Sequence, residues 1–224
     1  MLGGTSNHFR TSALCDAAGW DAWNVTEDAD LGLRLARMGY DVETLAATTY
    51  EEAPARLGAW LRQRRRWFKG WLQTFVTHSR TPRRLVAELG VLRAAAAFFL
   101  LGGGLVGSLC GPLFALVIGH DILFGDVLAP HSPLEIAAST SWLFICVTGM
   151  ASAVGPAVLG IRRRRLRAGV GWLCCLPAHY LLLSYAAWTA LFEFVHRPFY
   201  WAKTEHGLAR KPYRSGSIRR PLSP

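Results

Sequence analysis

Three long apolar runs dominate the second half of the sequence. Ala94–Gly119 and Ile136–Ile161 each contain 26 residues without a charge, and Ala168–Phe192 contains 25 uncharged residues apart from one histidine, His179. A helix needs about 20 apolar residues to cross the roughly 30 Å hydrocarbon core of a bilayer. Core helices of a soluble protein do not explain three runs of this length. The pattern therefore predicts transmembrane α-helices at 94–119, 136–161 and 168–195.

The first 85 residues instead alternate between short polar and apolar stretches. Thr26 is a favourable N-cap, and the carboxylates that suit a first helical turn follow it: Glu27, Asp28 and Asp30. Apolar side chains then recur at helical spacing, at Leu31, Leu35 and Met38, and Gly39 is a typical helix stop. Asp41–Leu45 predicts a short strand. We expect an α/β head (1–85), a membrane region of transmembrane α-helices (86–196) and a basic tail (197–224).

The charge distribution indicates which kind of partner the chain has. The formal charge is +10, from 25 Lys and Arg against 15 Asp and Glu, in a sequence that is 51% hydrophobic. That hydrophobicity excludes wholesale disorder, and the charge-free runs exclude a soluble nucleic-acid binder. Of the basic residues, 22 lie in three clusters beside the apolar runs, at 56–93, 162–167 and 197–220, whereas 120–135 has none. The clusters indicate a membrane partner and no nucleic-acid partner.

The positive-inside rule places all three basic clusters in the cytoplasm and residues 120–135 outside. These assignments conflict at the third apolar run, because a single crossing between Arg167 and Arg197 would separate two basic segments. Either this run is re-entrant or broken near Pro177, or the tail is an exception to the rule.

The segment Trp23–Asp30, WNVTEDAD, is the first candidate for chemistry. Its carboxylates can simply stabilise the start of a helix, or one of them can act as a general base for an attacking hydroxyl. Asp28 and Asp30 also form a D-x-D pattern. Residues two apart on a helix point about 200° apart, so these two carboxylates are not expected to bind one metal ion.

The second candidate is Trp60–Trp71, WLRQRRRWFKGW. Helical periodicity places one polar and aromatic set on a common face: Trp60, Gln63, Trp67 and Trp71, with Arg66 at its margin. An apolar side is formed by Leu61, Phe68, Leu72 and Phe75. Such a helix can lie at the headgroup level of a membrane. Its Trp rings can equally stack on sugars, and its Arg side chains can bind phosphate.

The Thr26-Glu27-Asp28 triplet, followed 35 residues later by Gln63-x-x-Arg66-Trp67, resembles the TED and Q-x-x-R-W motifs of processive family 2 glycosyltransferases. This group includes cellulose, chitin, hyaluronan and mannan synthases. Residues 3–10 and 19–21 resemble the segment that precedes TED in the family. The resemblance implies that residues 1–85 are the C-terminal half of a GT-A-type catalytic domain, and that the enzyme inverts the anomeric centre while extending a polysaccharide.

The resemblance also assigns roles to individual residues. Asp28 would be the catalytic base, with Thr26 and Glu27 fixing the start of its helix. Three residues would bind the acceptor: Trp67, by stacking on the terminal sugar, Gln63 and His8. Three others would bind the nucleotide diphosphate: Arg66, Lys203 and Thr204. The last two belong to 199–207, FYWAKTEHG, which resembles the gating loop of these synthases. The alternative for this segment is an interfacial Trp/Tyr belt followed by a headgroup-binding tail.

The same resemblance implies the cofactor, the partners and the location. The intact enzyme would use Mg²⁺ or Mn²⁺, held by a strand-end D-x-D that we do not find in this sequence. Its substrates would be a nucleotide sugar, with UDP or GDP as the nucleotide, and a glycan acceptor. We expect a multi-pass protein of the bacterial inner membrane with a cytoplasmic head.

Because the donor-side half of the catalytic domain is not recognisable, we expect an N-terminally truncated form that is inactive alone. The alternative is a noncatalytic membrane subunit that binds a glycan or a protein partner. A transporter has less support, because the apolar runs lack paired charges.

Overall fold

The computed structural model describes residues 4, 6–45, 49, 51, 53–124, 132–163 and 170–200. The elements in chain order are α1 (Thr11–Asp16), α2 (Glu27–Arg37), α3 (Leu57–Ser79), α4 (Pro82–Leu89), α5 (Val91–Phe98), the π-helical turn η1 (Phe99–Gly103), α6 (Gly104–Phe124), α7 (Pro133–Arg163), the 3₁₀ helix η2 (Val170–Cys175) and α8 (Leu176–His196). Within these ranges there is no strand, so the expected α/β character of the head is not confirmed.

The strand expected at Asp41–Leu45 does not form. These five residues are exposed and irregular. A β-strand requires a neighbouring strand to satisfy its backbone hydrogen bonds, and no extended segment pairs with 41–45 among the described residues. Alternating side chains were therefore insufficient evidence for a strand at this position.

The helix expected after Thr26 does form, and α2 ends as its sequence predicts. Met38 is the C-cap, and Gly39 follows it with a φ of +84°. The backbone N–H of Tyr40 donates to the carbonyl oxygen of Leu35, and that of Gly39 to the carbonyl oxygen of Ala36. This pair of hydrogen bonds is a Schellman motif, which requires the left-handed conformation that glycine adopts without strain.

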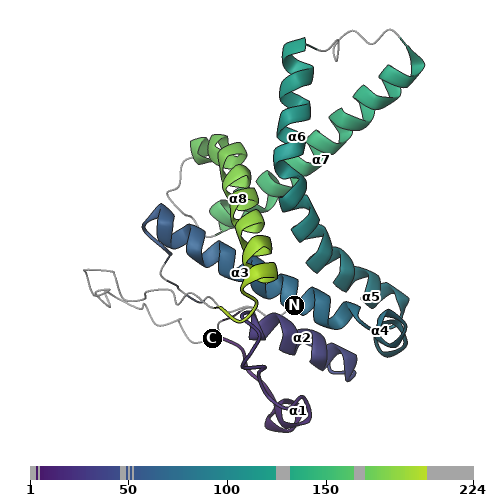
Figure 1. The fold of residues 1–224 in the computed structure, drawn as a ribbon, viewed down its shortest axis with the longest axis vertical. Coiled ribbons are helices and arrows are strands. Elements are labelled where there is room, and N and C mark those ends of the chain that lie inside the picture. Colours follow the sequence, from purple (N-terminus) through teal and green to yellow (C-terminus); the bar gives the residue numbers. More distant parts are fainter. Residues whose placement is uncertain are drawn as a thin grey trace, which may run out of the picture.

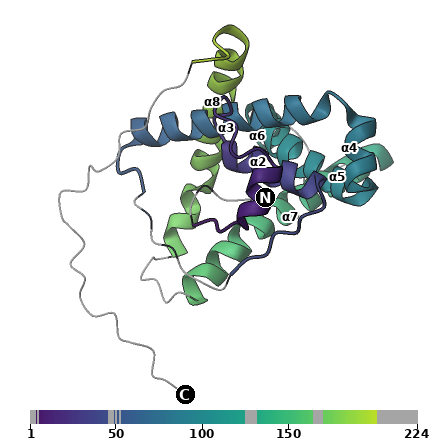
Figure 2. The same ribbon diagram turned by 90° about the horizontal axis from the view of Figure 1, so that it is seen from below.

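Helix α3 is the central element of the described structure (Figures 1 and 2), where it meets α2 and α4 and crosses α8. Its apolar side lies in a core formed with α6 and α8. Phe68 is 4% exposed there and packs with Leu105 and with the small residues Ala186, Ala187 and Ala190. The apolar side predicted for this helix is thus covered mainly by protein.

In the part of the chain that the structure describes, two helices are long and apolar enough to cross a membrane: Val91–His120, which combines α5, η1 and most of α6, and Pro133–Arg163, which is α7. They contain the first two predicted spans. The third apolar run is divided, because 3₁₀ helix η2 ends at Cys175 and α8 begins at Leu176, with Pro177 in its first turn. Helix α8 packs against α3 and α6, and the Trp188 indole N–H donates to the carbonyl oxygen of Leu109 at 3.0 Å.

Helices α6 and α8 approach each other closely at Gly111. A Cβ at Gly111 would overlap the Ser184 hydroxyl, whereas a Cβ at Gly107 on the same helix would meet no atom within 4 Å. Small residues at such positions allow membrane helices to approach closely.

We predict that Gly111→Val lowers the free energy of unfolding by about 1–3 kcal/mol, because the added side chain must push α8 away. Gly107→Val is the matched control and should be nearly neutral. Thermal unfolding of the detergent-solubilised protein, followed by tryptophan fluorescence, measures both. Equal melting temperatures for the two variants would contradict this account of the helix contact.

Candidate functional site

The loop that leads into α2 is held on α3 by side-chain hydrogen bonds. The Asn24 side-chain amide donates to the Thr74 hydroxyl at 2.8 Å, and its oxygen accepts from the Thr26 backbone N–H at 3.0 Å. One step further, the Val25 N–H donates to the Gln73 side-chain oxygen at 3.1 Å. Asn24, Thr26 and Thr74 are all buried. The start of α2 is therefore fixed to α3 by buried polar groups that satisfy one another.

Thr26 occupies the N-cap position of α2, but its side chain makes no capping hydrogen bond. It packs instead on Gly70 of α3. A Cβ at Gly70 would lie 2.5 Å from the Thr26 Cγ2 and Oγ1 atoms and 2.7 Å from its backbone nitrogen. Only a residue without a side chain permits this approach, which directly joins the TED segment to the helix that carries Q-x-x-R-W.

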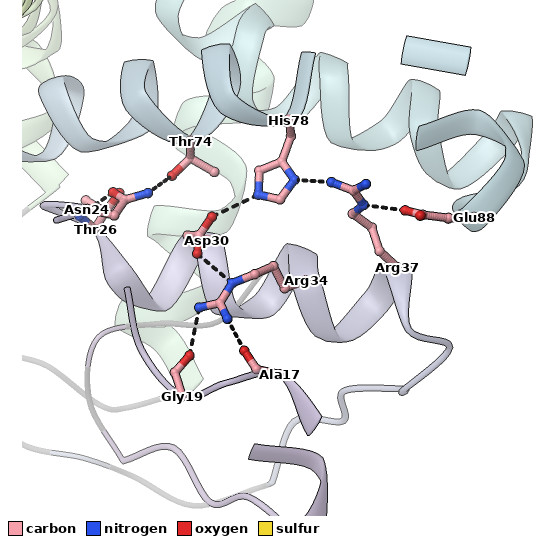
Figure 3. A network of polar contacts seen from close by, with 10 residues as sticks. All are labelled: Ala17, Gly19, Asn24, Thr26, Asp30, Arg34, Arg37, Thr74, His78 and Glu88. Carbon is pink, nitrogen blue, oxygen red and sulfur yellow. Dashed lines mark hydrogen bonds and ion pairs between the residues drawn. The ribbon is translucent and has the colours of Figure 1, made fainter. Parts of the chain in front are cut away.

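The carboxylates of Asp28 and Asp30 lie in different surroundings. Asp28 is half-buried beside Gly4, where a Cβ would lie 3.5 Å from its Oδ2 atom, and Glu27 is exposed. Asp30 is 4% exposed and bonds His78 and Arg34 (Figure 3). No group of three His, Cys, Asp or Glu side chains that could hold a metal ion occurs among the described residues.

One face of α3 continues from the Gly70 contact to the Q-x-x-R-W residues. Gln63, Arg66 and Trp67 precede Gly70 by seven, four and three residues, so the 3.6-residue period places them on the same side of the helix. All three are half-buried. The helix thus directs these side chains toward the face on which the start of α2 is docked.

Trp67 carries a cation on its ring. The Arg64 guanidinium lies 4.2 Å from the centre of the Trp67 ring and 5.2 Å from that of Trp60, whose ring also contacts His179 of α8. Burial lowers the pKa of Arg64, and the buried Nε atom of this residue has no hydrogen-bond partner in the described part of the chain. The cation–π contact of the guanidinium with the Trp rings takes the place of that hydrogen bond and contributes about 0.5–2 kcal/mol to stability. Trp60 and Trp67, which were predicted to lie on one face of the helix, thus share the Arg64 guanidinium.

A small basic groove adjoins this face. It is lined by Val25, Arg62, Arg65, Arg66, Lys69, Glu193 and Tyr200. Glu193 of α8 pairs with Arg65 at 3.2 Å and with Lys69 at 3.5 Å. Among the described residues, Arg62 and Arg66 are consequently the groove's guanidinium groups without an ion pair, and they supply its unbalanced positive charge.

Lys69 joins this groove to the end of α8. It is 2% exposed, and its ammonium group donates to the carbonyl oxygens of Arg197, at 2.7 Å, and Tyr200, at 2.5 Å. Burial lowers the pKa of Lys69, and the charge of Glu193 opposes this effect. Tyr200, the second residue of the predicted gating segment, is therefore anchored in the groove that Val25, the neighbour of the TED triplet, also lines.

The structure brings Thr26 to the side of α3 that carries Gln63, Arg66 and Trp67. Asp28 follows in the first turn of α2, where its Oδ2 atom lies near Gly4, and Glu27 is exposed. His8 is exposed in the segment before α1 and lies outside these contacts. Lys203 and Thr204 lie outside the described residues.

Several residues of the site carry no motif that identifies them. Asn24, Gln73, Thr74 and His78 hold the start of α2, and Lys69 holds the end of α8. Gly70 did offer a signal, because glycine in the middle of a helix costs about 1 kcal/mol relative to alanine and implies a close approach of another chain segment.

Comparison with known proteins places the chain among the glycosyltransferases. A family model described as glycosyl transferase family group 2 matches residues 2–203, and the chain belongs to this family. The probable glycosyltransferase YdaM of Bacillus subtilis (strain 168) is 37% identical over 68 residues, which are 30% of this chain and 16% of that protein. The match thus spans about a sixth of this relative. No solved structure matches the chain significantly.

We predict that Gly70→Ala separates α2 from α3, because its methyl group would overlap both the side chain and the backbone of Thr26. The loss should be about 1–3 kcal/mol in the free energy of unfolding, with faster amide hydrogen exchange in Glu27–Arg37. Gly58→Ala on the same helix is the matched control, since its Cβ would approach only Arg62, at an ordinary 3.6 Å. Unchanged exchange in the Gly70 variant would show that this contact does not hold α2.

Proposed function

We propose that the chain takes part in an inverting transfer of a sugar from a nucleotide sugar to a growing polysaccharide at the cytoplasmic face of a membrane. The observation that carries this proposal is the docking of the TED segment on the Q-x-x-R-W helix through Thr26 and Gly70. Two motifs separated by 35 residues thereby share one surface. Membership of family 2 supports transfer of a sugar, and the remaining assignments are proposals.

Asp28 is the proposed base. Its carboxylate is half-buried at the first turn of α2, where the positive end of the helix dipole favours a negative charge. It takes the proton of the acceptor hydroxyl while that oxygen forms a bond to the anomeric carbon of the donor sugar. The bond from this carbon to the phosphate oxygen breaks on the opposite side, and the nucleoside diphosphate leaves with the electron pair.

Trp67 and Gln63 are the proposed acceptor-binding residues of α3, and His8 is a further proposed contact. A sugar stacks well on an indole ring, and the Gln63 amide can bond hydroxyls. Because the Arg64 guanidinium covers one side of the Trp67 ring, a stacked sugar would use the other side. The cation also fixes the ring, which reduces the entropy lost on binding.

The basic groove is the proposed site for the leaving diphosphate. Arg62 and Arg66 supply guanidinium groups that bind phosphate oxygens in pairs. Lys203 and Thr204 follow Tyr200 by three and four residues. Since Lys69 anchors Tyr200 at this groove, the proposed gating segment begins within reach of it.

The two apolar helices Val91–His120 and Pro133–Arg163 support membrane attachment. We propose a multi-pass protein of the bacterial inner membrane with its head in the cytoplasm, as the basic clusters favour. A processive synthase that uses a UDP- or GDP-sugar with Mg²⁺ or Mn²⁺ is the finer assignment. A noncatalytic glycan-binding subunit is the alternative, and it would not require Asp28.

We predict that Asp28→Asn reduces sugar transfer by at least 100-fold while nucleotide-sugar binding is unchanged, because the amide cannot accept the proton. Transfer of labelled sugar is measured in membranes that contain the chain together with the donor-binding part of a family 2 enzyme. Asp16→Asn, at an exposed carboxylate that bonds only Tyr40, is the control. Near-normal transfer by the Asp28 variant would exclude it as the base and favour the noncatalytic alternative.

We predict that Trp67→Ala weakens binding of oligosaccharide acceptors by 10-fold or more, through the lost stacking surface. Titration calorimetry on residues 1–224 with cello-, chito- and manno-oligosaccharides measures this without any catalysis. Trp142→Ala is the control, since Trp142 packs on Phe114 between α6 and α7. Equal acceptor affinities for the two variants would contradict the role of Trp67.

A further inference from the structure

A continuous chain of polar contacts links α2, α3 and α4 (Figure 3). Asp30 of α2 lies 2.9 Å from Nε2 of His78 on α3, and Nδ1 of His78 lies 2.8 Å from the guanidinium of Arg37, at the other end of α2. Arg37 in turn donates to Glu88 of α4 at 2.6 Å. His78, at 4% exposure, is therefore the residue of α3 that contacts both ends of α2.

The direction of each hydrogen bond follows from the chemistry of the groups. A guanidinium has donors only, so Nδ1 of His78 must be the acceptor for Arg37. The ring proton then lies on Nε2 and is donated to Oδ1 of Asp30. The ring is held in one tautomer and one orientation, since rotation by 180° would turn a carbon–hydrogen group toward each partner and lose both bonds.

The other carboxylate oxygen of Asp30, Oδ2, is also hydrogen-bonded. It accepts from Arg34 at 2.7 Å, and the same guanidinium donates to the carbonyl oxygens of Ala17 and Gly19 in the turn after α1. Burial alone would raise the pKa of Asp30, but the hydrogen bonds from His78 and Arg34 hold it below its ordinary value. The carboxylate is thus a charged junction between α3 and the segment that precedes α2.

We propose that His78 is a positioning residue for the reaction. It holds Asp30 at one end of α2 and Arg37 at the other. These two contacts orient the first turn of α2, so that the Asp28 carboxylate faces the Gln63–Trp67 side of α3. The inference rests on the proposed role of Asp28. Asp28 is two residues from Asp30 in the same turn, so a rotation of α2 about its axis would move both side chains together.

Few other contacts of α2 could orient it on α3 if the His78 hydrogen bonds were lost. The Thr26–Gly70 contact and the hydrogen bonds of Asn24 and Val25 to α3 fix the segment that leads into α2, but they involve no side chain beyond its N-cap. The last turn of α2 is joined to α4 through Arg37 and Glu88. Among the described residues, His78 is the side chain of α3 that contacts both Arg37 and Asp30. Two anchors about 10 Å apart along the helix, seven residues at 1.5 Å each, define its direction.

The test compares His78→Leu, which keeps bulk but removes both hydrogen bonds, with His78→Gln, whose amide offers one donor and one acceptor at similar reach. His196→Leu is the control, because exposed His196 contacts its own helix at Phe192 and no other helix in the described part of the chain. In residues 1–224 in lipid nanodiscs, we expect His78→Leu to speed amide exchange in Glu27–Arg37 by 10-fold or more without changing Pro133–Arg163. His78→Gln should restore exchange to within about threefold of the original protein.

Transfer kinetics separate positioning from general stability. His78→Leu should lower kcat by 10-fold or more at unchanged KM for the acceptor, and His78→Gln should recover most of kcat. The inference would be overturned if His78→Leu exchanged its amides as slowly as the unsubstituted protein, or if His78→Gln lost as much kcat as His78→Leu. If His78→Leu loses transfer only in proportion to unfolded protein, the role is merely structural. Normal transfer by Asp28→Asn would instead refute the proposed function, whatever the exchange data show.

Discussion

The close approach of Thr26 to Gly70 is the contact on which the arrangement of the site depends. Among the described residues, the polar links of this segment to α3 are hydrogen bonds, which form only over a short distance and so require the two backbones to be this near. Asn24 reaches Thr74 and Val25 reaches Gln73 because no Cβ stands between the helices. The helix propensity lost at Gly70, about 1 kcal/mol, is the cost of this proximity.

Polar groups, more than apolar ones, determine how α2 is seated. A buried carboxylate is unfavourable unless its oxygens are paired, and Asp30 has two partners on different elements. Apolar packing on the other side, where Leu31 and Leu35 meet Ala13 and Ala17, supplies stabilisation with little directional preference. The hydrogen-bonded network therefore selects one rotation of α2 among the several that would bury the same apolar surface.

The sequence predicted those features that depend on local periodicity. The bounds of α2, its glycine stop and the apolar side of α3 follow from spacing alone, as do the first two long apolar helices. The strand at Asp41–Leu45 failed because pairing is not a local property. The partnership of His78 with Asp30, 48 residues away, could not be predicted either, since periodicity gives the face of a helix and not the neighbour that covers it. The positions of Lys203 and Thr204 stay predictions.

The end of α8 bears on the conflict between the basic clusters. Lys69 of the head bonds the carbonyl oxygens of Arg197 and Tyr200, so the first residues of the tail lie beside α3 and on the same side as the head. The apolar run that leads there is divided before Leu176, as a run broken near Pro177 would be. If the head is cytoplasmic, residues 197–200 are cytoplasmic too, which agrees with the side that the positive-inside rule predicts for the basic tail. The conflict would then come from treating 168–195 as one uninterrupted crossing. Helix α8, which forms most of this run, packs against both α3 and α6.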